Sequence, residues 1–152
     1  MALFPFIKKK EFFSAEQQTL MVDAVKNAEF NTSGEVRVFI ESRCKFVDPV
    51  DRAREIFLNL KMEATKDRNA VLLYMAMDDH QLALFADEGI YQRLGAAYWS
   101  FEVKKIVRAF TKDDYTGGIC SVIANIGEAL RAEFPYEKSD KNELPDEIIF
   151  GN

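Results

Sequence analysis

The sequence predicts an α/β fold in which a small mixed sheet carries helices on both faces. Between residues 15 and 86, helical patterns alternate with short apolar strands. The residues from Asn69 to Met77 carry no charge, which is typical of a strand buried on both faces. A strand–helix–strand crossover makes the first two strands parallel, and a tight turn makes the third antiparallel. Since both faces of such a sheet need covering, we expect a three-layer α/β/α sandwich.

The first helix is predicted to begin after Ser14. Ser14 and Gln17 have the spacing of a capping box, in which each side chain bonds the backbone N–H of the other residue. The segment Asn31–Gly34 supplies the turn residues that end this helix. Apolar residues recur at helical spacing and are expected to face the core: Leu20, Met21, Ala24, Val25 and Ala28.

The next segment, Glu35–Glu41, is predicted to be a strand. Its side chains alternate, and Val36, Val38 and Ile40 form the face that we expect to be better buried. The opposite face carries Glu35 and residues 37 and 39. One face of this strand is therefore expected to be apolar and the other mixed.

A second helix follows this strand. Asp48 and Pro49 combine an N-cap residue with proline at the first helical position, where the missing N–H costs nothing. The helix is expected to end near Thr65–Asp67, where polar residues gather. Its predicted buried residues are Ala53, Ile56, Phe57, Leu60 and Ala64.

An acidic turn joins the second and third strands. Asp78-Asp79 has the composition of a two-residue hairpin loop, so the residues that flank it should pair. Counting back along the ladder places Asn69 opposite Glu88 and Ala70 opposite Asp87. This strand pair therefore has an acidic group at each end, and function is expected at one of them.

The remainder of the chain is predicted to be mainly helical. One or two helices follow Gly89, Thr111–Tyr115 is a polar turn, and a last helix ends before Pro135. We divide the chain into an N-terminal arm (1–12), a globular domain (13–135) and a charged tail (136–152). Within the tail, Ile148–Phe150 is apolar and is expected to dock on the body of the domain or to serve as a docking peptide.

Composition excludes several classes of partner. The chain has 152 residues, with 20 basic and 25 acidic side chains, and a net charge of −5. Such a balance gives no general attraction to nucleic acid or to anionic lipid. Cys44 and Cys120 have no metal-type spacing and require no disulfide, which fits a reducing compartment. No apolar run approaches the length of a membrane span, so we expect a cytoplasmic protein.

Polar residues gather at both ends of the predicted sheet. At one end, Glu41 and Ser42 lie near the Asp78-Asp79 turn. At the other, which we call the Asp87 end, the start of the first two strands meets the end of the third. The residues expected there are Thr32, Ser33, Glu35, Arg68, Asn69, Asp87 and Glu88, together with Asp113 and Asp114 if the last helix packs back on the sheet.

The Asp87 end has the donor types of a divalent-cation site. Carboxylate, amide and carbonyl oxygens are the ligands of hard cations such as calcium and magnesium. Arg68 would suit an anion such as a phosphate group. The predicted metal ligands are Asp87, Glu88, Asp113 and Asp114, with Thr32, Glu35, Arg68 and Asn69 as binding residues and Asp78 and Asp79 as secondary metal candidates.

A purely structural role explains the same residues. Asp87 and Glu88 would favour the N-terminus of the following helix, and Asp113 or Asp114 would do so for the last helix. Arg68 would then only pair with a neighbouring acid. The Asp78-Asp79 pair is also an ordinary composition for a solvated turn. Spacing alone does not decide between these interpretations.

The common catalytic motifs are missing from the sequence. It has no Gly-x-Ser-x-Gly elbow, no phosphate-binding glycine loop and no His-Glu-x-x-His segment. His80 is the single histidine and has no obvious serine partner. No residue is a persuasive nucleophile or general base, so the sequence leaves enzyme status open.

Several segments together resemble the TPM-domain family, in particular its small stand-alone bacterial members. The resemblance covers roughly residues 12–135. The segments that carry it are Thr32–Val38 (TSGEVRV), Arg68–Tyr74 (RNAVLLY), Asp79-His80, Ala83–Ile90 (ALFADEGI), Tyr98-Trp99, Phe110–Gly118 (FTKDDYTGG) and the region from Ile126-Gly127 to Phe134-Pro135.

The resemblance implies a Rossmann-like α/β/α sandwich and a site at the Asp87 end. The family's functional positions match Thr32, Asn69, Asp87 and the Asp114-Tyr115 step. Family members have been described as calcium-binding and as phosphatase-like. Many relatives also carry a signal peptide, a glycine-rich tail and a transmembrane helix, which we do not expect for this chain.

Three functions follow as expectations. The first is a module that binds calcium or magnesium at the Asp87 end, without turnover. The second is a metal-assisted hydrolase of phosphomonoesters, in which the cation polarises the phosphate and activates a water. The third is a non-catalytic protein-interaction domain. The corresponding partners are a metal ion, a phosphate-containing small molecule or another protein.

Overall fold

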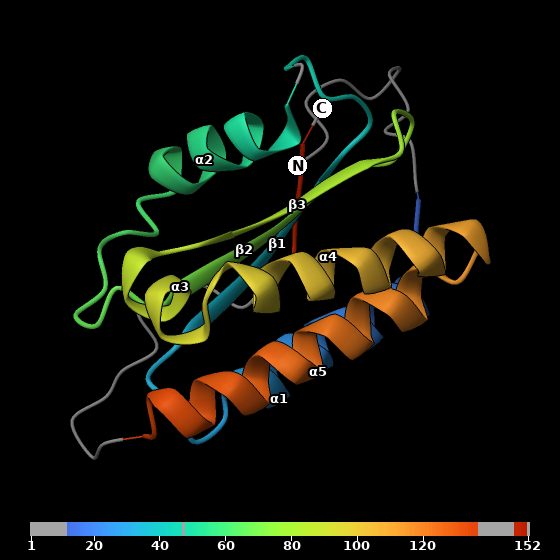
Figure 1. Cartoon of the computed structure of the whole chain (residues 1–152). Helices are drawn as coiled ribbons and strands as arrows, with labels where there is room; N and C mark the ends of the chain where they lie inside the picture. The colour runs from blue at the N-terminus through green and yellow to red at the C-terminus, as the bar shows by residue number, and fades with distance from the viewer. Residues whose placement is uncertain (1–11, 47, 137–147, 152) are drawn as a thin grey trace.

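The computed structural model describes residues 12–46, 48–136 and 148–151 (Figure 1). Most of the expected N-terminal arm, and residues 137–147 of the expected tail, lie outside the described residues. The described elements, in chain order, are α1 (Ala15–Glu29), β1 (Glu35–Glu41), α2 (Pro49–Asn59), β2 (Ala70–Ala76), β3 (Gln81–Ala86), α3 (Glu88–Leu94), α4 (Ala96–Thr111), α5 (Tyr115–Glu133) and β4 (Ile149–Phe150).

The strands form one mixed sheet in the order β3-β2-β1-β4. β1 is parallel to both β2 and β4, whereas β3 is antiparallel to β2. Helix α2 covers one face of the sheet, and α1, α4 and α5 cover the other (Figure 1). The predicted α/β/α sandwich with a small mixed sheet is therefore confirmed.

The β2–β3 hairpin has the predicted register. Ala76 pairs with Gln81 on either side of the acidic turn. At the far end of the ladder, the Asp87 N–H donates to the Ala70 carbonyl at 2.9 Å. The hairpin therefore fixes Asp87 beside the start of β2.

The core has two parts because the sheet is covered on both faces. Every residue of β2 is buried, as the uncharged run predicted. β1 differs from the prediction, because its mixed face is closed as well: Glu35, Arg37 and Glu41 are 2 %, 6 % and 4 % exposed. The polar side chains of that face lie on the same side of the sheet as α2, where Glu41 pairs with an arginine of that helix.

Two predictions about the helices need correction. Leu20 is 56 % exposed, because it lies just outside the narrow stripe of α1 that faces the core. Helix α2 ends at Asn59 rather than near Thr65–Asp67. Lys61 adopts a φ of +57°, which an α-helix does not accommodate. Ala64 is consequently exposed, and Leu60 is only partly buried.

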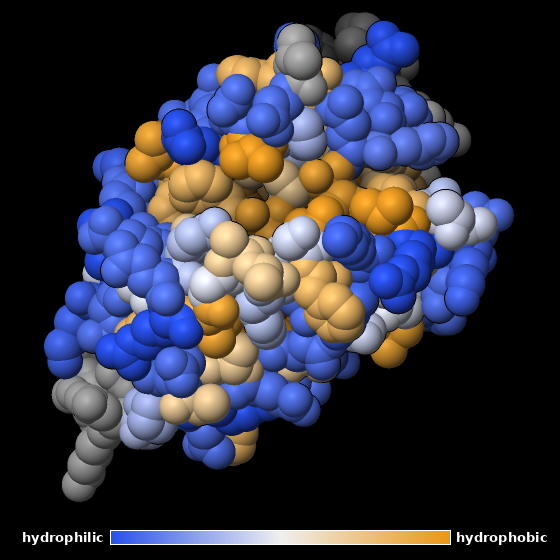
Figure 2. All heavy atoms as spheres, viewed as in Figure 1, coloured by the Kyte–Doolittle hydropathy of each residue, from blue (hydrophilic) through white to orange (hydrophobic). Residues whose placement is uncertain are grey.

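Strand β4 confirms that the segment Ile148–Phe150 docks on the domain. Ile149 and Phe150 pair with Phe39 and Ile40, and the Gly151 N–H donates to the Ile40 carbonyl at 2.7 Å. On the opposite side of the sheet, β3 is the outermost strand. The surface in this view is mainly hydrophilic, with an apolar band between α2 and α4 (Figure 2).

Candidate functional site

Arg68 and Asp87 form a bidentate ion pair at the Asp87 end. Arg68 Nε and Nη2 donate to the two carboxylate oxygens of Asp87 at 2.7 and 2.8 Å. Arg68 Nη1 lies 3.2 Å from Glu88 Oε1. These carboxylates raise the pKa of Arg68, the hydrogen bonds to Asp87 contributing most. The Arg68 guanidinium therefore already forms ion pairs with two carboxylates of its own chain.

Asp87 also caps a helix. Its carboxylate accepts a hydrogen bond from the Glu88 N–H at 2.8 Å, at the N-terminus of α3. The side chain is 5 % exposed, and both of its oxygens have partners within the chain. The structure thus gives Asp87 the capping and pairing role that was one of its two interpretations, and leaves Glu88 exposed beside it.

A chain of three polar side chains lies next to this ion pair. Asn69 Nδ2 donates to Ser33 Oγ at 3.0 Å, and Ser33 Oγ donates to Asp67 Oδ2 at 3.0 Å. Asn69 is 1 % exposed, and its Oδ1 accepts no hydrogen bond from any described residue. A buried polar atom without a partner is rare in folded proteins and points to a water, an ion or a ligand.

Thr32 and Glu35 have other surroundings. Thr32 Oγ1 donates to the Leu130 and Phe134 carbonyls and accepts from the Gly34 N–H at 3.1 Å. This hydroxyl therefore ties the end of α5 to the start of β1. Glu35 is buried on the face of β1 that α2 shares.

Asp113 and Asp114 do not join the Asp87 end. They lie beyond the C-terminus of α4, whose N-terminus is next to α3. A helix of 16 residues is about 24 Å long, so the two ends of α4 belong to opposite sides of the molecule (Figure 1). Asp114 caps α5 by accepting from the Gly117 N–H, and Asp113 accepts from the Tyr115 hydroxyl. The expectation that the last helix brings them back was wrong.

The Asp78-Asp79 turn is more than a solvated loop. Asp79 Oδ2 accepts a hydrogen bond from the Cys44 N–H at 2.7 Å. The Asp78 N–H donates to the Ser42 carbonyl at 2.8 Å. The turn thus holds the loop that follows β1 in place, and this contact places it beside the carboxyl end of that strand.

A buried polar network that sequence reasoning missed lies at that carboxyl end. Arg52 Nε and Nη2, from the first turn of α2, both donate to the Glu41 carboxylate at 2.9 Å. Tyr74, from β2, donates its hydroxyl to the same carboxylate. Arg52 also pairs with Glu55. The only sequence signals were a glutamate at the end of an otherwise apolar strand and an arginine soon after the helix cap.

The Tyr74 phenol should ionise only when the protein unfolds. Burial, and then the hydrogen bond to Glu41, raises the pKa of Tyr74 above its ordinary value of 10.0. The unfolded state ionises this phenol first, so folding stability is retained below about pH 10 and is lost as the pH rises further. We expect ultraviolet titration of phenolate to show Tyr74 ionising together with unfolding, a contribution that disappears in Tyr74→Phe.

A matched control for this titration is Tyr136→Phe, since Tyr136 is 53 % exposed. It removes a phenol from the surface of the folded protein and leaves the buried Tyr74 phenol in place. Tyr74→Phe should also lower the free energy of unfolding at neutral pH by about 1 kcal/mol, the usual net value of a lost hydrogen bond. Ionisation of Tyr74 near pH 10 in a folded sample would contradict the structure.

The described residues contain no cluster of three or more histidine, cysteine, aspartate or glutamate side chains arranged around a metal position. The amide and hydroxyl oxygens of Asn69 and Ser33, with the Asp67 carboxylate, are instead the hard donors at the Asp87 end. None of the helices in the described ranges has the length and hydropathy that a membrane span requires.

Comparison with known proteins identifies similar structures. A solved structure of the BA42 protein from the psychrophilic bacterium Bizionia argentinensis is 38 % identical and has a TM-score of 0.86; the match covers 95 % of this chain and 99 % of that one. The N-terminal domain of the cg2496 protein from Corynebacterium glutamicum is 12 % identical (TM-score 0.62), over 98 % of this chain and 92 % of that chain. An N-terminal domain from P. gingivalis is 15 % identical (TM-score 0.70), over 82 % of each chain.

The last two structures share the fold alone. No curated protein matches the chain. A family model described as the TPM domain matches residues 7–129, which include both the Asn69 network and the Glu41–Arg52 network. Because this match spans most of the sequence, the chain belongs to the TPM domain family, as the resemblance indicated.

Proposed function

We propose that this TPM domain binds a divalent cation, calcium or magnesium, at the Asp87 end of the sheet. The observation that supports the proposal is the buried Asn69 Oδ1, which lacks a partner among the described residues. An unsatisfied buried acceptor costs about 1–3 kcal/mol, and a bound cation removes that cost. Ser33 accepts a hydrogen bond from Asn69 and donates one to Asp67. These two side chains therefore add a hydroxyl oxygen and a carboxylate oxygen to the site.

Such a site should be weak. Calcium affinity rises with the number of charged ligands, and the Asp87 carboxylate is already neutralised by Arg68. The positive guanidinium also repels a nearby cation. We therefore expect calcium dissociation constants of about 10⁻⁴–10⁻³ M, the range of weak calcium modules.

Calcium and magnesium titrations followed by backbone amide shifts test this proposal. Shifts should centre on Ser33 and Asp67–Asn69 and saturate in the millimolar range. Asn69→Asp places a carboxylate at the orphan oxygen, so we expect binding at least about tenfold tighter and a calcium-dependent rise in melting temperature. Asp78→Asn, at the opposite end of the sheet, is the control and should bind like the wild type.

Two results would overturn the assignment. Shifts confined to the Asp78-Asp79 turn would move the cation to the other end of the sheet. Unchanged spectra in Asn69→Asp, at calcium concentrations well above 10⁻³ M, would leave Asn69 as a structural residue only. Phosphomonoester turnover measured on the same samples separates a binding module from a hydrolase. A binding module gives no turnover in the wild type or in Asn69→Asp.

A further inference from the structure

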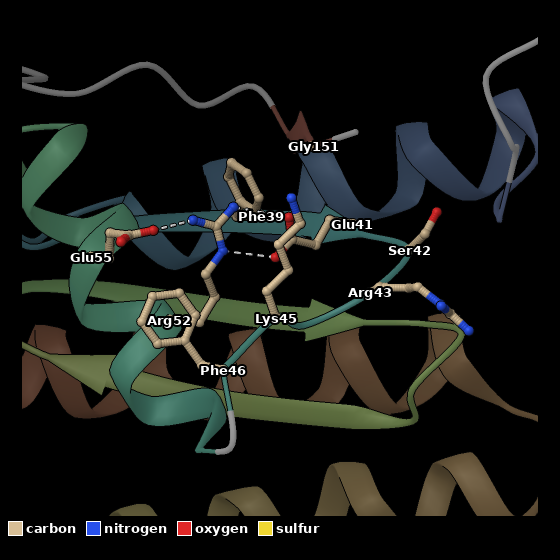
Figure 3. A pocket seen from close by; sticks show the side chains of 9 residues that line it. All are labelled: Phe39, Glu41, Ser42, Arg43, Lys45, Phe46, Arg52, Glu55 and Gly151. Atoms are coloured by element: carbon tan, nitrogen blue, oxygen red, sulfur yellow. Dashed lines mark hydrogen bonds and ion pairs between the residues drawn. The ribbon is translucent and has the colours of Figure 1, made fainter. Parts of the chain in front are cut away.

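A pocket of about 730 Å³ opens at the carboxyl end of β1, away from the Asp87 end (Figure 3). This volume falls in the range of about 300–1,000 Å³ that small-molecule sites occupy. Its walls come from three segments: the end of β1 with the loop after it, the first turns of α2, and Gly151 next to β4. The proposed cation site uses none of these residues.

The position of the pocket agrees with the topology. The strand order runs from β1 to β2 and β3 on one side, and β4 lies on the other side. In open α/β sheets, ligands bind outside the carboxyl ends of parallel strands where the strand order reverses. The carboxyl ends of β1 and β4, both parallel, meet at this pocket.

The charges of the pocket favour an anion. The carboxylates of Glu41 and Glu55 are both paired with Arg52, and those hydrogen bonds and charges raise the pKa of Arg52, the bond to Glu41 contributing most. Arg43 and Lys45 are exposed and form no ion pair with any described carboxylate. After the internal pairs are counted, positive charge remains.

The apolar part of the pocket is aromatic. The rings of Phe39 and Phe46 line it, and Phe46 is 37 % exposed. The Arg52 guanidinium lies 5.8 Å from the centroid of the Phe39 ring. Figure 3 shows the Lys45 ammonium extending toward the same space as Arg52 and Phe39, while Arg43 extends outward at the rim. Because the Phe39 ring already stacks on Tyr74, with 6.3 Å between the ring centroids, the exposed Phe46 ring is the stacking surface for a planar ligand, with a cation beside it.

We propose that this pocket binds a small aromatic anion, such as a mononucleotide. The aromatic ring of the ligand stacks on Phe46 beside Phe39, and its anionic group bonds Lys45, with Arg43 adding positive charge at the rim. Arg52 remains paired with Glu41 and Glu55, so it shapes the wall rather than holding the anion. Gly151 packs closely against the Phe39 ring, since a Cβ there would lie 2.8 Å from Phe39 Cε1.

Adenosine monophosphate is the probe for this pocket, with adenosine and inorganic phosphate as its separate halves. All titrations contain a chelator, so their outcome does not depend on the cation site. We expect adenosine monophosphate to bind at least about tenfold more tightly than either half and to shift the amides of residues 39–46. Lys45→Gln should weaken binding by about two- to fivefold, as the loss of an exposed charge pair does, and higher salt should do the same.

Lys104→Gln is the matched control, because Lys104 is an exposed lysine of α4, outside the pocket. It removes the same charge and should leave the affinity unchanged. Three outcomes would overturn the proposal: no binding at millimolar probe, shifts outside residues 39–55 and 151, or equal effects of the two lysine variants. Binding of phosphate alone as tightly as the nucleotide would likewise exclude an aromatic ligand.

Discussion

Arg52→Met is expected to lower the free energy of unfolding by about 2–3 kcal/mol. The change leaves the Glu41 carboxylate, 5 % exposed, with the Tyr74 hydroxyl as its remaining side-chain hydrogen-bond donor among the described residues. Breaking a fully buried ion pair costs about 3–5 kcal/mol, because an uncompensated charge stays in the interior. The value should be smaller here since the Arg52 side chain is 23 % exposed. Denaturant unfolding at neutral pH measures the difference.

A second substitution identifies the cause of this loss. In the Glu41→Gln/Arg52→Met protein the charge is gone, and the amide oxygen still accepts from Tyr74, so most of the stability should return. Arg108→Met, at an exposed position of α4, is the control and should change the free energy of unfolding by less than about 0.5 kcal/mol. A double variant no more stable than Arg52→Met would show that lost packing, rather than the stranded charge, explains the effect.

Gly89→Ala is expected to lower the free energy of unfolding by about 3 kcal/mol. A Cβ at this position would lie 2.2 Å from the Asp67 carbonyl oxygen and 2.6 Å from the Arg68 carbonyl oxygen. Both are backbone atoms, so no rotamer change relieves the clash. The turn before β2 must move, and overpacking of that kind costs about 1–3 kcal/mol, or more where backbone shifts. Thermal unfolding followed by circular dichroism reports the loss.

The same substitution should disturb the Asn69 network, since Asp67 and Arg68 belong to that turn. Amide shifts of Ser33 and Asn69 are therefore expected to change in Gly89→Ala. Gln92→Ala, at an exposed position of α3, tests the effect of alanine on the helix itself and should be nearly neutral. Wild-type stability in Gly89→Ala would mean that the turn is farther from α3 than the structure places it.

Local rules predicted most of the fold. The alternating segment Glu35–Glu41 has the same first and last residues as β1. Alternation of side chains between the two faces is a local property of a strand, so its limits can be predicted from the sequence. The two-residue turn fixed the register of β3 and so placed Asp87 beside Ala70. The capping box at Ser14 has both of its hydrogen bonds. Each of these features depends on residues close together in the chain.

Long-range geometry accounts for what was missed. Asp114 was expected at the Asp87 end, but it lies on the opposite side of the molecule. The apolar stripe of α4 shows which face of the helix is buried and does not show in which direction the helix runs across the sheet. The mixed face of β1 is buried because Arg52, eleven residues later, turns back over Glu41. The pocket joins that pair to a strand that begins at residue 149. None of these pairings has a signature in the spacing of residues.

Strand β4 also decides what the sheet presents to other chains. It is only two residues long, yet it pairs with β1 on the side that would otherwise be a sheet edge. Nearer the start of β1, the Glu29 carboxylate accepts the Val36 N–H at 2.9 Å. Unpaired strand edges are templates for edge-to-edge aggregation. A short strand and one carboxylate therefore shield this edge, so solubility while the chain folds depends in part on β4, which lies far from β1 in sequence.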